Sequence, residues 1–256
     1  MIHETAIVSE NANIADDVSI GPYSIIGPDV SIGSATIIES HVVITGRTTI
    51  GKQNHLYSFS TIGESPQDMK YKGEDTELEI GDCNTIRESC TINKGTVQDT
   101  GVTRLGNDNW IMAYVHIAHD CQIGNNTIFA NNTTLGGHVE VGDYAIFGGF
   151  SGAHQFCKIG SHSFLGIYSG VAKDLPPYVI VTGQPAVPMG INIEGLKRRG
   201  FTTEQIRNIK NAYKLLYNSD LRLEEAKEKI SGLDEVSNEL QVMLEFIQAS
   251  TRGIIR

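Results

Sequence analysis

A six-residue repeat runs through most of this 256-residue chain. Pairs of an aliphatic residue and a glycine recur at spacings of 6, 12 or 18 residues within each of two series, and apolar residues fill most of the sixth positions between them. The pairs fall at Ile20-Gly21, Ile26-Gly27, Ile32-Gly33, Ile50-Gly51, Ile62-Gly63, Ile80-Gly81, Leu105-Gly106, Ile123-Gly124, Leu135-Gly136, Val141-Gly142, Ile159-Gly160 and Leu165-Gly166. Such a period predicts a solenoid, in which each repeat buries its apolar residue only by stacking on its neighbours.

The repeat length also predicts the shape of the solenoid. One residue in six points inward, and three hexads close a triangular coil of about 18 residues. Asn125-Asn126 and Asn131-Asn132 suit the corners of this coil, because asparagine tolerates left-handed backbone. Coils stacked at the usual strand separation of about 4.8 Å form a parallel β-helix. Hexads of this type are known to build left-handed β-helices, an exception to the right-handed crossover rule.

Two segments interrupt the repeat. In residues 63–79 the sixth positions are Asp68 and Glu74, which cannot face a dry core. In residues 93–104 the phase slips, because Ile80 and Leu105 are 25 residues apart, one more than four hexads. Both segments are predicted to be loops that leave the coil, and loops on a rigid scaffold often carry function. The alternative is that they are merely tolerated insertions.

The repeat ends within residues 173–188, whose prolines predict an irregular connection. From residue 191 onward the apolar spacing is helical, with a possible capping box from Thr202 to Gln205 at the start of 201–217 and further amphipathic helices in 221–230 and 237–256. The predicted fold class is mainly β. A left-handed parallel β-helix of hexapeptide repeats over residues 1–190 precedes a small α-helical domain over residues 191–256.

Composition narrows the functional classes. The formal charge of −10 argues against nucleic-acid binding. The chain has no apolar run of the roughly 18 residues that a membrane span needs, and its first residues lack the pattern of a secretory signal. The four cysteines form no C-x-x-C pair, so reduced thiols in a cytoplasmic protein are expected. We therefore expect a cytoplasmic protein without membrane insertion.

Three histidines are predicted to share one corner of the β-helix. Residues 18 apart lie on successive coils, which places His119 one coil from Gly137, beside His138. His154 lies one coil beyond Gly136, so the three imidazoles form a column. His116 precedes the inward Ile117 and therefore points outward.

This column has three possible explanations. It could be a solvated or inter-subunit polar stripe. It could bind zinc, as the γ-class carbonic anhydrases do with histidines from adjacent coils. It could also supply a general base for acyl transfer, with Asp120 favouring the required tautomer of His119.

The chain resembles the family of cytoplasmic UDP-N-acetylglucosamine O-acyltransferases that begin lipid A synthesis. The resemblance covers essentially all 256 residues and rests on "QDMKYKGE", "IRESCTINKGT", "HIAHDCQIGNN", "GAHQFCKIG" and "INIEGLKRRGF". It implies that His119 is the general base that deprotonates the glucosamine 3-hydroxyl as it attacks the thioester of a (R)-3-hydroxyacyl carrier protein. Asp120 matches the acidic residue that orients this base, and Gly137 matches the N–H that holds the oxyanion.

The resemblance further implies substrate-binding positions, a trimer and a direct transfer. The implied substrate-binding residues are Asp68, Lys70, His116, His138, His154, Gln155, Asn192, Glu194, Arg198 and Arg199. Gly166 and Ile167 match the position of the acyl-chain ruler. The family works as a homotrimer with sites between subunits, uses no covalent acyl-enzyme, and implies no cofactor and no metal. "LKRRG" at 196–200, with Lys173 and Lys210, would form a basic rim for the acidic acyl carrier protein.

Two residues depart from the family pattern. Many relatives have a histidine in "TIHRG" where this chain has Asn93, which leaves open whether the acceptor is the 3-hydroxyl or a 3-amino UDP-sugar. Relatives that use long acyl chains tend to have a small residue where this chain has Ile167, so we hypothesise that Ile167 shortens the preferred chain.

Two further alternatives remain at this point. The downstream N-acyltransferase of the same pathway adds an N-terminal uridine-binding domain, for which hexads that begin by about residue 8 leave no room. A non-catalytic trimeric scaffold that binds the carrier protein is the other.

Overall fold

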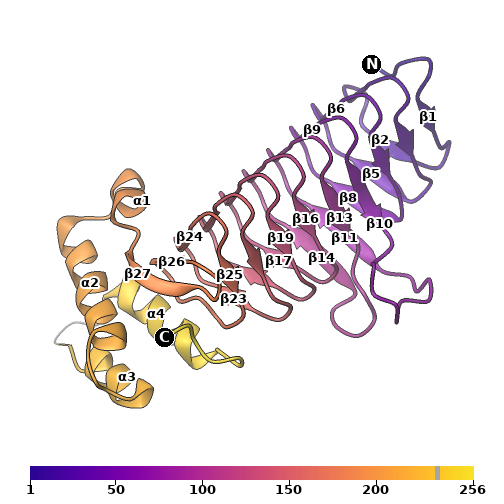
Figure 1. Ribbon diagram of the computed structural model, residues 1–256. Coiled ribbons are helices and arrows are strands. Elements are labelled where there is room, and N and C mark those ends of the chain that lie inside the picture. The colour runs from indigo at the N-terminus through magenta and orange to yellow at the C-terminus, as the bar shows by residue number, and fades with distance from the viewer. Residues whose placement is uncertain (234–236) are drawn as a thin grey trace.

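The computed structural model, which describes residues 1–233 and 237–256, is a triangular β-helix followed by helices at one end (Figure 1). All three walls of the prism are parallel sheets, apart from one antiparallel strand at the C-terminal end of the third wall. The predicted fold class is confirmed, because the chain has the strand order of a hexapeptide β-helix and solved relatives with the same fold.

The three walls contain the following strands in their order of pairing. The first wall is β1 (Ile7–Val8), β4 (Ile25–Ile26), β7 (Val43–Ile44), β10 (Thr61–Glu64), β13 (Thr91–Asn93), β16 (His116–Ile117), β19 (Thr134–Leu135), β22 (Gly152–Ala153) and β25 (Gly170–Val171). The second wall is β2 (Asn13–Ile14), β5 (Val30–Ile32), β8 (Arg47–Ile50), β11 (Glu77–Ile80), β14 (Val102–Leu105), β17 (Gln122–Ile123), β20 (Glu140–Val141) and β23 (Lys158–Ile159). The third wall is β3 (Ser19–Ile20), β6 (Ile37–Ile38), β9 (His55–Leu56), β12 (Thr85–Ile86), β15 (Trp110–Ile111), β18 (Ile128–Phe129), β21 (Ile146–Phe147), β24 (Phe164–Leu165), β26 (Val179–Thr182) and β27 (Val187–Ile191).

The predicted coil length is confirmed by the register. Ile117 pairs with Leu135, and Leu135 pairs with Ala153, so residues 18 apart lie level on successive coils. The repeating aliphatic residues fill the interior, where side chains such as Ile44 and Leu56 are 0 % exposed. Burial of each such aliphatic side chain stabilises the fold by about 1.5–3 kcal/mol relative to leaving it in water. The second asparagine of each predicted pair takes the left-handed conformation, with φ of 56° at Asn126 and 63° at Asn132.

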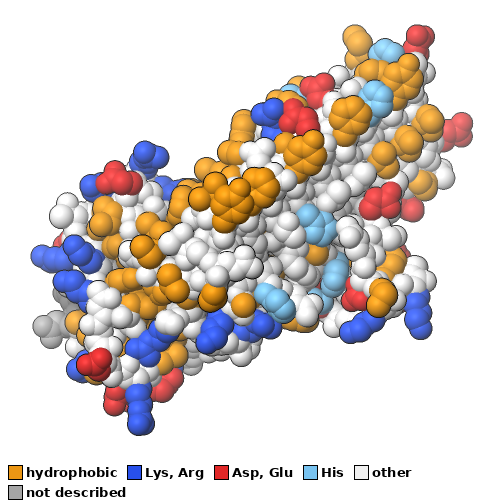
Figure 2. Space-filling model, viewed as in Figure 1, with side chains coloured by type: hydrophobic (Ala, Val, Ile, Leu, Met, Phe, Trp, Pro, Cys, Tyr) orange, Lys and Arg blue, Asp and Glu red, His pale blue; other side chains and the backbone are white. Residues whose placement is uncertain are grey.

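The corners between the walls form three edges. The histidine edge, between the first and second walls, holds residues 119–120, 137–138 and 155–156. The Tyr144 edge, between the second and third walls, holds residues 143–144 and 161–162. The aromatic edge, between the third and first walls, carries exposed rings at Tyr23, Phe59, Tyr114, Phe150 and Tyr168. Figure 2 shows apolar side chains following one edge of the prism.

Both predicted loops leave the coil at the histidine edge (Figure 1). Each connects a first-wall strand to a second-wall strand, β10 to β11 and β13 to β14. The loops span 65–76 and 94–101 and are shorter than the predicted 63–79 and 93–104. The difference arises because the flanking strands extend beyond the usual two residues and continue their parallel pairing.

The prediction of an irregular connection over 173–188 was wrong in part. Val179 and Val181 are 0 % exposed, and β26 adds to the third wall parallel to β24. β27 then turns back antiparallel to β26. This hairpin continues the wall past the last hexad, so that β26 does not remain an unpaired edge.

The helices are α1 (Ile193–Arg198), α2 (Thr203–Tyr217), α3 (Leu223–Ser231) and α4 (Asn238–Gln248). The predicted capping box is present. The Thr202 hydroxyl accepts a hydrogen bond from the backbone N–H of Gln205, and the Gln205 side chain accepts one from the backbone N–H of Thr202. The helices bury a second core that includes Leu196, Ile209 and Met243. None of the described helices is long and apolar enough to cross a bilayer. The domain boundary at residue 191 stays a prediction.

The last predicted helix is shorter than expected. α4 ends at Gln248, and Gly253 takes a left-handed φ of 71°. The tail then returns to the β-helix, where Asp174 accepts a hydrogen bond from the Ser250 hydroxyl at 2.6 Å and pairs with the backbone of Ile255. Buried contacts at the end of the β-helix therefore override the helical spacing of the last residues.

Candidate active site

His119 and Asp120 form a hydrogen-bonded pair on the histidine edge, directly after β16. The Nδ1 atom of His119 lies 2.8 Å from Oδ2 of Asp120. Asp120 occupies the left-handed corner position, with φ of 60°, and its side chain is fully buried. The imidazole of His119 is 13 % exposed. The Nδ1–H tautomer donates to the carboxylate and leaves Nε2 as the basic nitrogen.

Loop 94–101 completes the surroundings of Asp120. The backbone N–H of Thr96 donates to Oδ1 at 2.9 Å, and the Thr96 hydroxyl donates to Oδ2 at 2.6 Å. Burial alone would raise the pKa of the Asp120 carboxyl, but the hydrogen bonds from His119 and Thr96 outweigh it and hold the pKa below its usual value. Asp120 is therefore an anion at neutral pH and stabilises positive charge that develops on His119.

Gly137 lies against the ring of His119. A Cβ atom built at Gly137 would be 2.5 Å from Cε1 and 2.7 Å from Nε2 of His119, closer than real Cβ contacts allow. Within the described ranges, the backbone N–H of Gly137 donates no hydrogen bond to the protein. A free N–H can donate to an oxyanion, and the basic nitrogen beside it can accept the proton of the attacking group.

His138 packs beside His119 on the next coil. The two rings meet edge to face with centroids 4.9 Å apart, and His138 stacks on Phe156 at 4.3 Å. Its Nδ1 atom lies 2.9 Å from Oδ2 of Asp99 and 3.7 Å from Oδ2 of Asp120. The two histidines thus each face a carboxylate through Nδ1.

The other residues predicted for this edge lie around the pair. His116 is outward on β16, and its Nδ1 lies 2.7 Å from the Thr91 hydroxyl. Burial, and then the charge of His119, lower the pKa of His116, so His116 is neutral. His154 and Gln155 follow β22 one coil beyond Gly136 and Gly137, and both are exposed. Figure 2 shows histidines gathered beside the projecting loops.

Asp68 and Lys70 lie in loop 65–76, which leaves the same edge two coils earlier. The Asp68 carboxylate accepts the backbone N–H of Lys70 at 2.9 Å, and Lys70 is exposed. Lys94 of the second loop lies 5.5 Å from the ring centroid of Tyr71 and so links the two loops. Among the described contacts, neither Asp68 nor Lys70 touches the histidines.

The predicted nucleotide-end residues lie at a different edge. The Arg199 guanidinium lies 4.8 Å above the ring of Tyr144, on the Tyr144 edge. Asn192 caps α1 through Gly195 and donates to the carbonyl of His162 on that edge. Glu194 pairs with Lys197 at 3.0 Å, and Arg198 is exposed in the same helix. A single chain therefore does not bring Asn192, Glu194, Arg198 or Arg199 to His119.

Ile167 and Gly166 lie at the aromatic edge. The Ile167 side chain is 61 % exposed, beside Tyr168, which stacks on Phe150. A cavity of about 660 Å³ crosses the first wall between this edge and the histidine edge. Its lining includes His154, Gly152, Gly170 and Phe150. Glycines at the outward positions of β22 and β25 leave this surface open.

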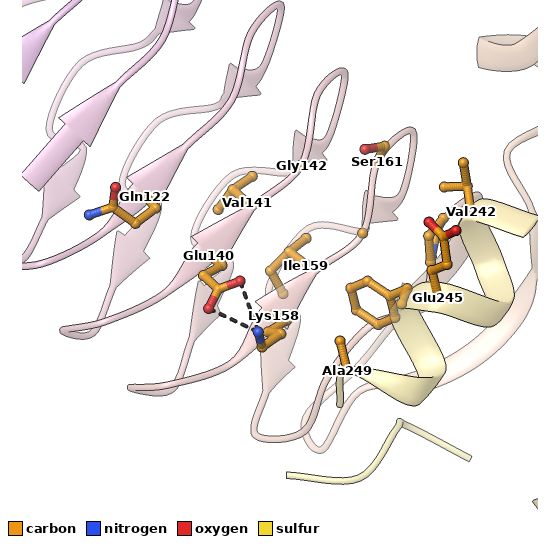
Figure 3. A pocket seen from close by; sticks show the side chains of 13 residues that line it. Gln122, Glu140, Val141, Gly142, Lys158, Ile159, Ser161, Val242, Glu245 and Ala249 are labelled. Atoms are coloured by element: carbon orange, nitrogen blue, oxygen red, sulfur yellow. Dashed lines mark hydrogen bonds and ion pairs between the residues drawn. The ribbon is translucent and has the colours of Figure 1, made fainter. Parts of the chain in front are cut away.

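Another cavity, of about 540 Å³, lies between the second wall and α4 (Figure 3). Lys158 pairs with Glu140 at 3.0 Å on its floor, and Phe246 of α4 lines it. It contains none of the predicted site residues.

Asn93 is 4 % exposed and donates from Nδ2 to the carbonyl of Ser65 at 3.1 Å. Its Oδ1 is buried without a hydrogen-bond partner among the described residues. Asn93 therefore ties down the base of loop 65–76.

Three cysteines are unsuited to nucleophilic chemistry. Cys90, Cys121 and Cys157 are 0 % exposed, and burial raises their pKa values to about 11, 12 and 11. A thiol with such a pKa stays protonated at neutral pH. Cys121 and Cys157 are therefore small buried residues of the core. Cys83 is exposed.

Sequence reasoning missed Thr91, Thr96 and Asp99, which hydrogen-bond His116, Asp120 and His138. The one available signal was the phase slip at 93–104, which marks the loop that carries Thr96 and Asp99.

Three residues of the site have the ligand types and spacing that a metal ion needs. The ligand atoms of His119, Asp120 and His138 all lie within 4.8 Å of one another, so these three residues could hold an ion.

The fold and this site define a transferase of the hexapeptide-repeat class. The family model "Bacterial transferase hexapeptide (six repeats)" matches residues 11–46 and 103–137, and "Udp N-acetylglucosamine O-acyltransferase; Domain 2" matches residues 174–255. An acyl-[acyl-carrier-protein]–UDP-N-acetylglucosamine O-acyltransferase of Thiobacillus denitrificans is 60 % identical over 255 residues, covering 100 % of this chain and 99 % of the relative. The chain belongs to the acyl-[acyl-carrier-protein]–UDP-N-acetylglucosamine O-acyltransferase family.

Solved structures agree with this placement. LpxA from Acinetobacter baumannii is 48 % identical with a TM-score of 0.96, covering 100 % of this chain and 99 % of that one. The Francisella novicida UDP-N-acetylglucosamine acyltransferase is 46 % identical with a TM-score of 0.97, covering 100 % and 94 %. Membership of this family excludes two of the earlier alternatives, the zinc enzyme of the γ-class carbonic anhydrase type and the downstream N-acyltransferase with its added domain.

Proposed function

We propose that this chain transfers a (R)-3-hydroxyacyl group from acyl carrier protein to the 3-hydroxyl of UDP-N-acetylglucosamine, the first step of lipid A synthesis, in the cytoplasm. The observation that carries the proposal is the His119–Asp120 pair, whose Nε2 and the adjacent Gly137 N–H lie together at the histidine edge. A carrier protein bound to the "LKRRG" segment of a neighbouring copy would deliver the thioester to this edge.

The chemistry follows from this pair. His119 Nε2 takes the proton of the 3-hydroxyl as its oxygen attacks the thioester carbon, and the Asp120 carboxylate stabilises the imidazolium that forms. The Gly137 N–H donates to the developing oxyanion. Collapse breaks the carbon–sulfur bond, and the imidazolium returns the proton to the thiolate of the carrier protein. The acyl group moves directly, without a covalent acyl-enzyme, and needs no cofactor.

We further propose a homotrimer whose sites lie between subunits. The Tyr144 edge carries Arg199 and Asn192, whereas the histidine edge carries His119. A second copy that places its Tyr144 edge against the histidine edge would unite them, with Arg suited to the diphosphate. Exposed rings along the third, aromatic edge, such as Phe59 at 62 %, supply further apolar surface for association between copies.

An assay with UDP-N-acetylglucosamine, its 3-amino analogue and carrier-protein thioesters of graded length tests the proposed function. We expect acylation of the 3-hydroxyl substrate. Exclusive use of the 3-amino analogue would identify the acceptor as the 3-amino UDP-sugar, and no transfer to either would contradict the proposal.

We expect the substitution Ile167→Gly to shift the chain preference toward longer acyl groups. Ile167 is exposed on the aromatic edge, two residues before Ser169, which lines the cavity that crosses the first wall. Its removal would expose space in which each added methylene gains about 0.8 kcal/mol, roughly fourfold in kcat/KM. Competition between thioesters of different length measures the shift.

Ile167→Leu is the matched control, because it keeps the volume and should keep the preference. An unchanged preference in Ile167→Gly would show that the chain ends elsewhere.

A further inference from the structure

Loop 94–101 contacts both the carboxylate partner of His119 and the imidazole of His138. Thr96 donates two hydrogen bonds to Asp120, the partner of His119. Three residues later, Asp99 reaches Nδ1 of His138 at 2.9 Å. The inserted residue that shifts the repeat here therefore lies in a loop that supplies the carboxylate partner of His138 and hydrogen-bonds the carboxylate partner of His119.

We propose that Asp99 is a positioning residue that fixes the tautomer of His138, so that His138 Nε2 accepts a hydrogen bond from a hydroxyl or amide N–H of the bound nucleotide sugar. A neutral imidazole carries one proton, and a carboxylate can only accept. Asp99 thus holds the proton on Nδ1 and leaves the lone pair on Nε2. The identity of the donor rests on the proposed function, but the tautomer does not.

The geometry assigns this role to Asp99 and not to Asp120. Asp120 Oδ2 lies 3.7 Å from His138 Nδ1, beyond hydrogen-bond distance, and already accepts from His119 and Thr96. Asp99 lies at 2.9 Å. Ring stacking on Phe156 and the edge contact with His119 hold the imidazole plane, so the hydrogen bond to Asp99 decides which nitrogen carries the proton.

Ring-nitrogen NMR of protein labelled in histidine tests the tautomer, at a pH well above the ordinary imidazole pKa of about 6.5. We expect the Nδ1–H form at His138 in the unaltered protein. In Asp99→Ala the His138 signals should move toward the Nε2–H form, while His119 keeps its Nδ1–H signal because Asp120 is untouched. An unchanged His138 tautomer in Asp99→Ala would overturn the proposal.

Steady-state kinetics test the consequence. We expect Asp99→Ala to raise the KM for the nucleotide sugar about five- to tenfold, which is the loss of affinity expected for one hydrogen bond. The change in kcat should be smaller. Asp99→Asn, whose amide oxygen still accepts from Nδ1–H, should restore most of the affinity. Gln98→Ala, an exposed neighbour in the same loop, is the control and should change neither constant.

The possible failures are distinguishable. A shifted tautomer with an unchanged KM would overturn the role of Nε2 as a substrate acceptor. If the unaltered protein acylates no nucleotide sugar, the proposed function fails, yet the NMR result still decides the role of Asp99.

Discussion

Replacing His119 by alanine should lower kcat by about 10²- to 10⁴-fold while leaving the β-helix folded. The imidazole both hydrogen-bonds the Asp120 carboxylate and lies against the backbone of Gly137. Without it, the acceptor hydroxyl keeps its proton during attack. The ring projects outward from the histidine edge, so its loss removes little from the core. Turnover with saturating substrates and the thermal unfolding midpoint measure both effects.

The controls separate loss of the base from loss of structure. His119→Gln keeps much of the volume and can still bond Asp120 but cannot take a proton, so it should be as inactive as His119→Ala. His3→Ala, on the exposed first coil, should keep full activity. Retained transfer in both His119 variants would favour the non-catalytic scaffold over the enzyme.

Much of this site could be predicted because the repeat fixes the register. Once Ile117 and Leu135 are recognised as inward residues of neighbouring coils, Gly137 is level with His119 and His138 is level with Asp120. The position of His138 beside His119, with ring centroids 4.9 Å apart, therefore follows from the coil length. In a solenoid, position along the sequence nearly determines position in space.

The loops could not be predicted in the same way. Thr96 and Asp99 lie 24 and 39 residues from the side chains that they bond. Their positions depend on the conformation of loop 94–101, which follows no repeat, so the phase slip indicated where a loop lay but not what it touched. The same holds for the tail, whose apolar residues fit a helix but whose contacts with Asp174 bring it back to the β-helix.

Arg199 illustrates a different limit. Its place above Tyr144 puts it on a separate edge from His119, and no property of a single chain unites the two. If the nucleotide end and the base act on one substrate, that substrate must lie between two copies. A loss of affinity for the nucleotide sugar on changing Arg199, without loss of the His119–Asp120 pair, is what a shared site would produce.

Gly137→Ala should lower kcat by about 10²-fold or more, although it adds a single methyl group. The new Cβ would lie 2.5 Å from Cε1 of His119, and the β-helix backbone is held by the ladders on either side. The imidazole is therefore the group that moves, and a displaced ring loses its hydrogen bond to Asp120 and its aim at the acceptor hydroxyl.

Gly27→Ala is the matched control. Gly27 follows a first-wall strand on an early coil. A Cβ atom there would meet its nearest neighbour at an ordinary distance of 3.4 Å, so activity should persist. Equal activity in the two variants would mean that His119 does not act from the position described, whereas loss confined to Gly137→Ala would show that the missing side chain at 137 is what lets the base stand there.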